Sequence, residues 1–106
     1  MIVSLGKTED IPPGSAKEFS VEQKAIFIIN HDGHLHAYEN SCPHLGIPLN
    51  WQENQFLDHD GELIQCASHG ALFTIDSGAC VAGPCLGGHL KQYEVNCIDG
   101  KITLTL

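Results

Sequence analysis

The stretch "SCPHLGIPLNW", residues 41–51, places a cysteine and a histidine one residue apart in a segment with the proline and glycine typical of a loop. A second pair follows in "CASHGALF", residues 66–73, where two residues separate Cys66 from His69. Between His44 and Cys66 lie 21 residues. If both segments are loops on one side of a sheet, they present four metal ligands to a single point.

The identity of these four ligands does not decide which metal is bound. Two cysteines and two histidines suit a structural zinc ion. A zinc finger, however, usually pairs Cys with Cys and His with His, whereas each segment here carries one of each. This arrangement allows two metal atoms to be held unequally, one by Cys42 and Cys66 and the other by His44 and His69.

Composition excludes several classes of protein. The chain has 106 residues, 13 acidic side chains and five lysines without arginine, for a formal net charge of -8. Clustered cations that would displace phosphate counterions are absent, so we expect no nucleic-acid partner. The longest strongly apolar run, "AIFII" at 25–29, is too short to cross a bilayer, and no export signal is visible. We expect a cytoplasmic monomer without a membrane partner.

The remaining pattern predicts an all-β domain over residues 1–106. Short apolar and aromatic runs are separated by turn residues, including Asp32-Gly33 and Asp99-Gly100. The tract 48–57 could hold a short helical piece. The expected strands are 17–21, 24–30, 34–39, 62–66, 71–76, 90–95 and 101–106.

These motifs resemble the Rieske 2Fe-2S proteins, whose signature is Cys-x-His followed by Cys-x-x-His. The matching segments are "CPHLGIPL" at 42–49 and "CASHGALF" at 66–73. The likeness extends over nearly the whole chain and is greatest to the stand-alone Rieske-type ferredoxins. It implies a small antiparallel β sandwich or barrel with a two-loop cluster-binding subdomain, the Rieske fold.

The resemblance implies one Rieske 2Fe-2S cluster, with Cys42 and Cys66 on the inner iron and His44 and His69 on the outer, solvent-facing iron. Two thiolates make the oxidised site neutral, which raises its potential to roughly -150 to +300 mV, against about -400 mV for plant-type ferredoxins. High-potential members add two loop cysteines, a serine and a tyrosine. At these positions the chain has Ile47, Ser68, Ala71 and Phe73 instead. We therefore predict a potential at the low end of the range.

Three further features come from the same resemblance. Gly46 and Gly70 are expected to let the backbone approach the cluster, and "GPC" at 83–85 resembles the loop that covers it. The spacer between the ligand loops is longer than usual, with the extra residues at 50–61 predicted to form a surface excursion that affects docking. Its Trp51 and Phe56 are more often packing residues than partner anchors.

The function implied is one-electron transfer, from a flavin- or NAD(P)H-linked reductase to an oxygenase-type partner by transient docking. We expect no substrate site and hence no enzyme, since neither an oxygenase domain nor a nucleotide-binding glycine motif is present. Acidic residues of the spacer, Glu53, Asp58 and Asp60, are candidates for steering a basic partner. The alternatives are a redox-sensing or accessory Rieske subunit of a larger complex, and a zinc-stabilised binding module.

Other cysteines and histidines have simpler explanations. Cys80 and Cys85 could form a disulfide or bind a second metal, but no histidine or acidic ligand set lies beside them, which favours reduced core residues. Cys97 has no apparent partner. The remaining histidines are read as surface residues, although His34 and His36 share a strand face. They are His31, His34, His36, His59 and His89.

Overall fold

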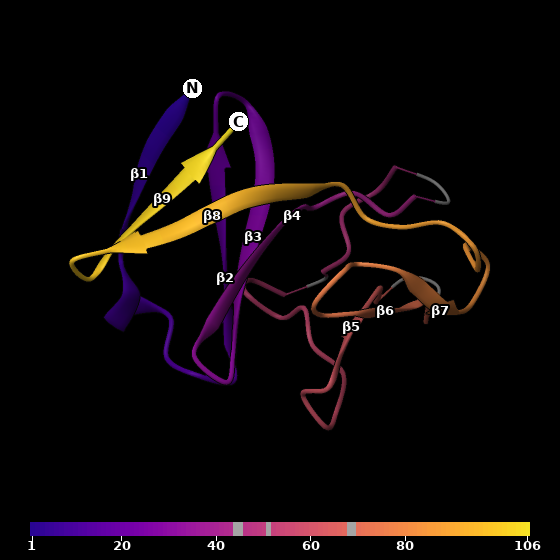
Figure 1. Ribbon diagram of the computed structural model, residues 1–106. Helices are drawn as coiled ribbons and strands as arrows, with labels where there is room; N and C mark the ends of the chain where they lie inside the picture. Colours follow the sequence, from indigo (N-terminus) through magenta and orange to yellow (C-terminus); the bar gives the residue numbers. More distant parts are fainter. Residues whose placement is uncertain (44–45, 51, 68–69) are drawn as a thin grey trace.

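The computed structural model describes residues 1–43, 46–50, 52–67 and 70–106. Two antiparallel sheets form the protein (Figure 1). The larger has the strand order β1-β9-β8-β4-β3-β2 and the smaller the order β5-β6-β7. The strands are β1 (Ile2–Lys7), β2 (Ser15–Val21), β3 (Lys24–His31), β4 (His34–Glu39), β5 (Leu63–Gln65), β6 (Leu72–Thr74), β7 (Cys80–Ala82), β8 (Gln92–Ile98) and β9 (Lys101–Thr105), with one 3-10 turn, η1 (Thr8–Asp10).

Two-residue turns set the register of the large sheet. Asp32 and Gly33 connect β3 to β4 with φ of 54° and 88°, as the Asp-Gly pair predicts for a type I′ hairpin. Asp99 and Gly100 connect β8 to β9 with φ of 52° and 77°. Because such turns match the right-handed twist of the strands, they bring consecutive strands together without a longer loop.

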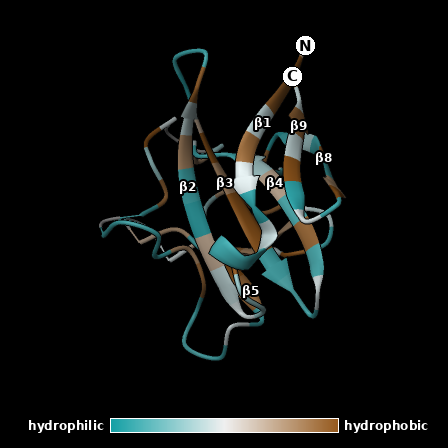
Figure 2. Cartoon of the chain, turned by 90° about the vertical axis from the view of Figure 1, so that its left-hand side faces the viewer, coloured by the Kyte–Doolittle hydropathy of each residue, from teal (hydrophilic) through white to brown (hydrophobic). Residues whose placement is uncertain are grey.

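Strand β3 is buried on both faces and divides the core in two. Phe27 and Ile29 pack into the cluster shared with the small sheet and the Cys/His loops. Ile26 and Ile28 point the other way, into a cluster with Ile102 and other residues of the large sheet. Alternate residues of a strand face opposite sides, so an uninterrupted apolar run is needed here. Figure 2 shows β3 as largely hydrophobic along its length.

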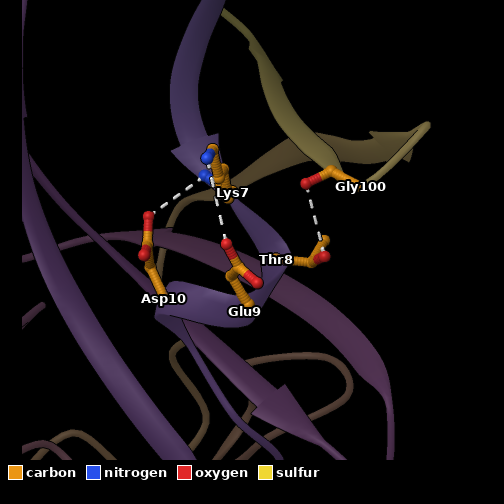
Figure 3. Close-up of polar contacts among 5 residues, drawn as sticks. All are labelled: Lys7, Thr8, Glu9, Asp10 and Gly100. Carbon is orange, nitrogen blue, oxygen red and sulfur yellow. Dashed lines mark hydrogen bonds and ion pairs between the residues drawn. The ribbon is translucent and has the colours of Figure 1, made fainter.

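The end of β1 is tied to the β8–β9 turn (Figure 3). The Thr8 amide and hydroxyl both donate to the Gly100 carbonyl oxygen, at 2.9 and 3.3 Å. The Lys7 amide donates to Asp10 Oδ2 at 3.1 Å, and Lys7 Nζ lies 3.9 Å from Glu9 Oε1. These contacts join η1 and the end of β1 to the β8–β9 turn of the large sheet, and the small sheet lies beside the large one (Figure 1).

The antiparallel all-β prediction is confirmed, but two strands were not predicted. They are β1, which is interrupted by a bulge between Ser4 and Gly6, and the three-residue β7. The possible helical piece at 48–57 is wrong for the described residues of that tract, which form turns and bends. Within the described ranges, no helix is long and apolar enough to cross a membrane.

Candidate metal centre

The structure places the two cysteines of the predicted ligand set in one buried core cluster. Cys42 and Cys66 are both fully buried and belong to the core cluster between the two sheets. His44 and His69 lie outside the described residues. Over the part of the chain that is described, no three His, Cys, Asp or Glu side chains gather to hold a metal. The described half of the candidate centre is therefore a pair of buried thiols.

Two backbone hydrogen bonds join the described ends of the first ligand loop. The Cys42 amide donates to the Ile47 carbonyl oxygen at 2.8 Å, and the Gly46 amide donates back to the Cys42 carbonyl oxygen at 2.7 Å. Gly46 has φ +70°, a conformation that residues with a Cβ adopt at a cost. The loop thus holds the Cys42 backbone rigidly and requires glycine at its fifth position.

The second ligand loop repeats the same turn. The Cys66 amide donates to the Ala71 carbonyl oxygen at 2.9 Å, and the Gly70 amide donates to the Cys66 carbonyl oxygen at 2.9 Å. Gly70 has φ +68°, and a Cβ built on it would meet no atom within 4 Å. Both glycines are therefore explained by backbone conformation, while their predicted close approach to a cluster stays a prediction.

A backbone hydrogen bond joins the two loops. The Ala67 amide, next to Cys66, donates to the Leu49 carbonyl oxygen at 2.8 Å. The Leu49 amide in turn donates to Asn40 Oδ1 at 2.7 Å, and Asn40 Nδ2 donates to Asn50 Oδ1 at 2.9 Å. Sequence reasoning did not identify Asn40, because nothing in the sequence separates a buried asparagine from the common surface one.

The loop between β7 and β8, residues 83–91, packs against both ligand loops and is called the third loop below. A Cβ built on Gly83 would come within 2.7 Å of the Ala71 Cα, so only glycine fits there. A Cβ on Gly88 would lie 3.9 Å from the Pro43 Cβ in the first ligand loop. These contacts support the position expected for the loop containing residues 83–85, although its covering of a cluster is not tested.

Two of the remaining cysteines lie in or beside the third loop, Cys85 on the loop itself and Cys80 on the preceding strand β7. Cys80 and Cys85 are reduced, 6% and 8% exposed, and their Sγ atoms lie 3.1 Å apart. Burial, followed by the hydrogen bond to Cys80 and the nearby thiolates of Cys80 and Cys42, raises the pKa of Cys85 to about 12. Both are thus buried core thiols, as the simpler sequence interpretation held.

The positions that distinguish high-potential relatives are apolar where the structure describes them. Phe73 and Ala71 are fully buried, and Ile47 packs against the same core cluster. None of these three side chains can donate a hydrogen bond. Ser68, the fourth position, lies outside the described residues.

The spacer at 50–61 is exposed or half-buried at every described residue except Phe56, which anchors it to the core. Phe56 is 1% exposed and stacks on Phe27 with ring centroids 4.2 Å apart. Asp58 Oδ1 accepts hydrogen bonds from the Glu62 and Leu63 amides at 2.9 and 3.1 Å. The packing role of Phe56 is confirmed, whereas Trp51 lies outside the described residues.

The remaining histidines are dispersed over the hairpin and loops. His34, His59 and His89 are exposed, while His31 and His36 are half-buried. Burial lowers the pKa of His36, with Asp76 opposing this effect. None of them joins a metal-binding group of three among the described side chains.

Comparison with known proteins gives an independent result. The family model described as "Rieske [2Fe-2S] domain" matches residues 1–97. The chain is 34% identical over 104 residues to the cytochrome b6-f complex iron-sulfur subunit of Chlorobaculum tepidum, covering 98% of this chain and 53% of that protein. The chain thus spans about half the length of the curated Chlorobaculum relatives it matches.

Two ferredoxins match over more of their own length. The ferredoxin component of the alkene monooxygenase system of Xanthobacter autotrophicus is 30% identical over 104 residues, with 96% of this chain and 79% of that protein covered. The solved ferredoxin of carbazole 1,9a-dioxygenase from Nocardioides aromaticivorans IC177 superposes with a TM-score of 0.82 at 21% identity, covering 99% of this chain and 97% of the other. The structural match supports the fold alone.

Proposed function

This chain belongs to the Rieske 2Fe-2S family, and from that membership we propose that it is a one-electron carrier whose cluster is bound by Cys42, His44, Cys66 and His69. A bound 2Fe-2S cluster supplies a centre that accepts and returns a single electron. The observation that carries the proposal is the repeated turn of the ligand loops, which gives Cys42 and Cys66 the same backbone environment.

The described residues fit this cofactor. Both thiols are fully buried, and the loops that carry them are joined by the hydrogen bond from Ala67 to Leu49. Paired buried thiolates on rigid loops are the donor set that binds one iron. The open space beside Gly70 leaves room next to the second loop. The two histidines complete the set by family resemblance.

We assign electron exit to the end of the molecule that carries the ligand loops and the third loop. Val81 and Leu86 are 48% and 69% exposed, and both lie in or beside the third loop. Figure 1 shows this loop at the opposite end of the molecule from the β8–β9 turn. Exposed apolar side chains beside a redox site favour short-lived contact with a partner.

The partners proposed are a flavin- or NAD(P)H-linked reductase and an oxygenase-type protein. The oxygenase class is supported by the names of the ferredoxin relatives, one a component of an alkene monooxygenase system and one a ferredoxin of a dioxygenase. The reductase is proposed because a carrier needs a donor. Such a carrier has no substrate site of its own and acts in the cytoplasm.

Stopped-flow oxidation by cytochrome c tests the carrier function with a basic one-electron acceptor. The dithionite-reduced protein should transfer one electron per chain, and faster at low ionic strength because the chain carries a net charge of -8. Leu86→Ser should slow the transfer, while the matched control Ile98→Ser, at the far end and 62% exposed, should not. Absence of a one-electron transfer would overturn the proposal.

The second candidate is a redox-sensing or accessory Rieske subunit. It is favoured by the 34% identical relative, which is named as a subunit of a cytochrome complex. Size-exclusion chromatography of the protein from its native source separates the two. A carrier elutes as a monomer, whereas an accessory subunit elutes in a larger complex.

A further inference from the structure

The Cys80 and Cys85 side chains form a thiol pair that the proposed electron transfer does not use. Their Sγ atoms are 3.1 Å apart, and a disulfide bond is about 2.05 Å long, so the sulfurs need to approach by only about 1 Å. Cys80 lies on β7 and Cys85 on the third loop, and both belong to the core cluster that contains Cys42 and Cys66.

The backbone around the pair is already held in position. The Cys80 amide donates to the Gly88 carbonyl oxygen at 2.9 Å, and the Gly88 amide donates to the Cys85 carbonyl oxygen at 2.8 Å. This chain of bonds links both cysteines through one residue. Their separation is therefore fixed by the fold, which is the condition for forming a disulfide without large backbone movement.

The pair lies next to the ligand loops. Gly83, between the two cysteines, packs on Ala71 of the second loop, and Gly88 faces Pro43 of the first. A covalent bond between Cys80 and Cys85 would close the third loop against both. Among the described residues, no group of three His, Cys, Asp or Glu side chains is placed to hold a metal ion, which argues against a second metal site at this pair.

We propose that Cys80 and Cys85 are an oxidisable dithiol that forms an intrachain disulfide when the protein meets a low-molecular-weight disulfide such as oxidised glutathione. One cysteine sulfur attacks the disulfide, releases one glutathione thiol and forms a mixed disulfide. The other cysteine then displaces the second glutathione. Two electrons and two protons pass from the cysteines to two glutathione molecules, and the 2Fe-2S cluster takes no part.

The pair should react slowly, because both sulfurs are buried and the loop must open to admit the oxidant. Cys97 is exposed and would react first. A Cys97→Ser background removes that reaction and leaves four cysteines. The test uses the cluster-loaded Cys97→Ser protein, incubated with oxidised glutathione, alkylated and analysed by intact mass and peptide mapping.

The expected result is a loss of two alkylatable thiols with no glutathione attached to the protein. Peptide mapping should then find a single cross-link, joining Cys80 to Cys85. Adding Cys80→Ser to the background should abolish the cross-link and leave Cys85 able to take up one glutathione. Iron and sulfide are measured in parallel, so cluster loss is seen separately from thiol oxidation. The cross-link is identified by mass alone, so this outcome does not depend on electron transfer.

Two outcomes would overturn the proposal. In one, Cys80 and Cys85 of the folded protein stay fully alkylatable, although the same oxidant oxidises them in the unfolded chain over the same time. In the other, the cross-link joins Cys42 to Cys66 or either of these to the pair. Because peptide mapping of the Cys97→Ser protein answers both, the test stands even if the Cys80→Ser variant does not fold.

Discussion

The Ala67 amide donates a 2.8 Å hydrogen bond to the carbonyl oxygen of Leu49, which joins the two ligand loops directly. Because Ala67 follows Cys66, the bond fixes the second cysteine relative to the first loop. Leu49 is in turn held by Asn40, which lies only two residues before Cys42. The two ligand loops are thus joined by a backbone hydrogen bond and by the side chain of Asn40.

Asn40→Ala should destabilise the ligand loops while leaving the large sheet folded. It removes the acceptor of the Leu49 amide and the donor to Asn50, and a buried amide left unpaired costs about 1–3 kcal/mol. We expect faster iron loss to a chelator. The matched control is Asn96→Ala, an exposed asparagine on β8, which should lose iron at the wild-type rate. Equal rates in the two variants would contradict this.

Removing the hydroxyl should change the stability of the fold differently at two buried tyrosines, Tyr38 and Tyr93. Tyr38 donates to the Ile75 carbonyl oxygen, so Tyr38→Phe leaves that oxygen unpaired at a cost of about 1–3 kcal/mol. The Tyr93 hydroxyl has no hydrogen-bond partner within the described chain, so Tyr93→Phe should be neutral or stabilising. Melting temperatures measured in parallel check the pair; a drop of about 4 °C or more is expected for Tyr38→Phe alone.

Alkaline pH should weaken the fold through Tyr38. Burial, followed by the charge of Asp76, raises the pKa of Tyr38 from 10.0 to about 12. A pKa raised in the folded state contributes stability that is complete below pH 10 and is lost as the pH rises toward 12. Unfolding curves of the wild type should therefore decline over this window more steeply than those of Tyr38→Phe, and parallel declines would refute the assignment.

Phe73→Tyr should raise the midpoint potential of the cluster. We predict a wild-type value near the low end of the Rieske range, about -150 mV, because Ile47, Ala71 and Phe73 donate no hydrogen bonds. One added hydrogen bond to sulfur, worth about 1 kcal/mol, corresponds to about 40 mV for a one-electron couple. Protein-film voltammetry checks both values. Phe19→Tyr, in the other core cluster, is the control and should leave the potential unchanged.

The midpoint potential should also fall as pH rises into the alkaline range. If His44 and His69 bind the outer iron as proposed, oxidised iron would favour their deprotonated imidazoles, and reduction at alkaline pH would then require proton uptake. One proton per electron gives a slope of about -59 mV per pH unit. Replacement of the exposed His59 or His89 by Gln should not alter this slope. A flat response would count against solvent-facing histidine ligands.

Local sequence signals predicted the parts of the fold that depend on neighbouring residues. The hairpin of β3 and β4 follows from an apolar run, an Asp32-Gly33 turn and a second run. Strand β7 was not predicted, because three residues between glycine-rich segments become a strand only by pairing with β6. Strand β1 was missed for a similar reason, since a bulge between Ser4 and Gly6 breaks its alternation, and among the described strands it pairs with β9 alone.

The same distinction between local patterns and contacts of distant segments applies to the candidate centre. Cys42 and Cys66 could be proposed as ligands because the spacing of metal ligands is a local pattern, and their role as ligands stays a prediction. Asn40 and the contact of Gly83 with Ala71 were not predicted, because they arise when distant segments meet. The stacking of Phe56 on Phe27 likewise shows why the longer spacer is held against the core, which its polar composition did not indicate.

The most direct test of the central claim is visible and electron paramagnetic resonance spectroscopy of the anaerobically purified protein, before and after dithionite, with iron and sulfide quantified. We predict two irons and two sulfides per chain and the signal of a reduced cluster with mixed nitrogen and sulfur ligands. Cys42→Ser and Cys66→Ser should lose it, while Cys97→Ser should keep it. Colourless protein carrying zinc, or an unaltered signal in Cys42→Ser, would contradict the account.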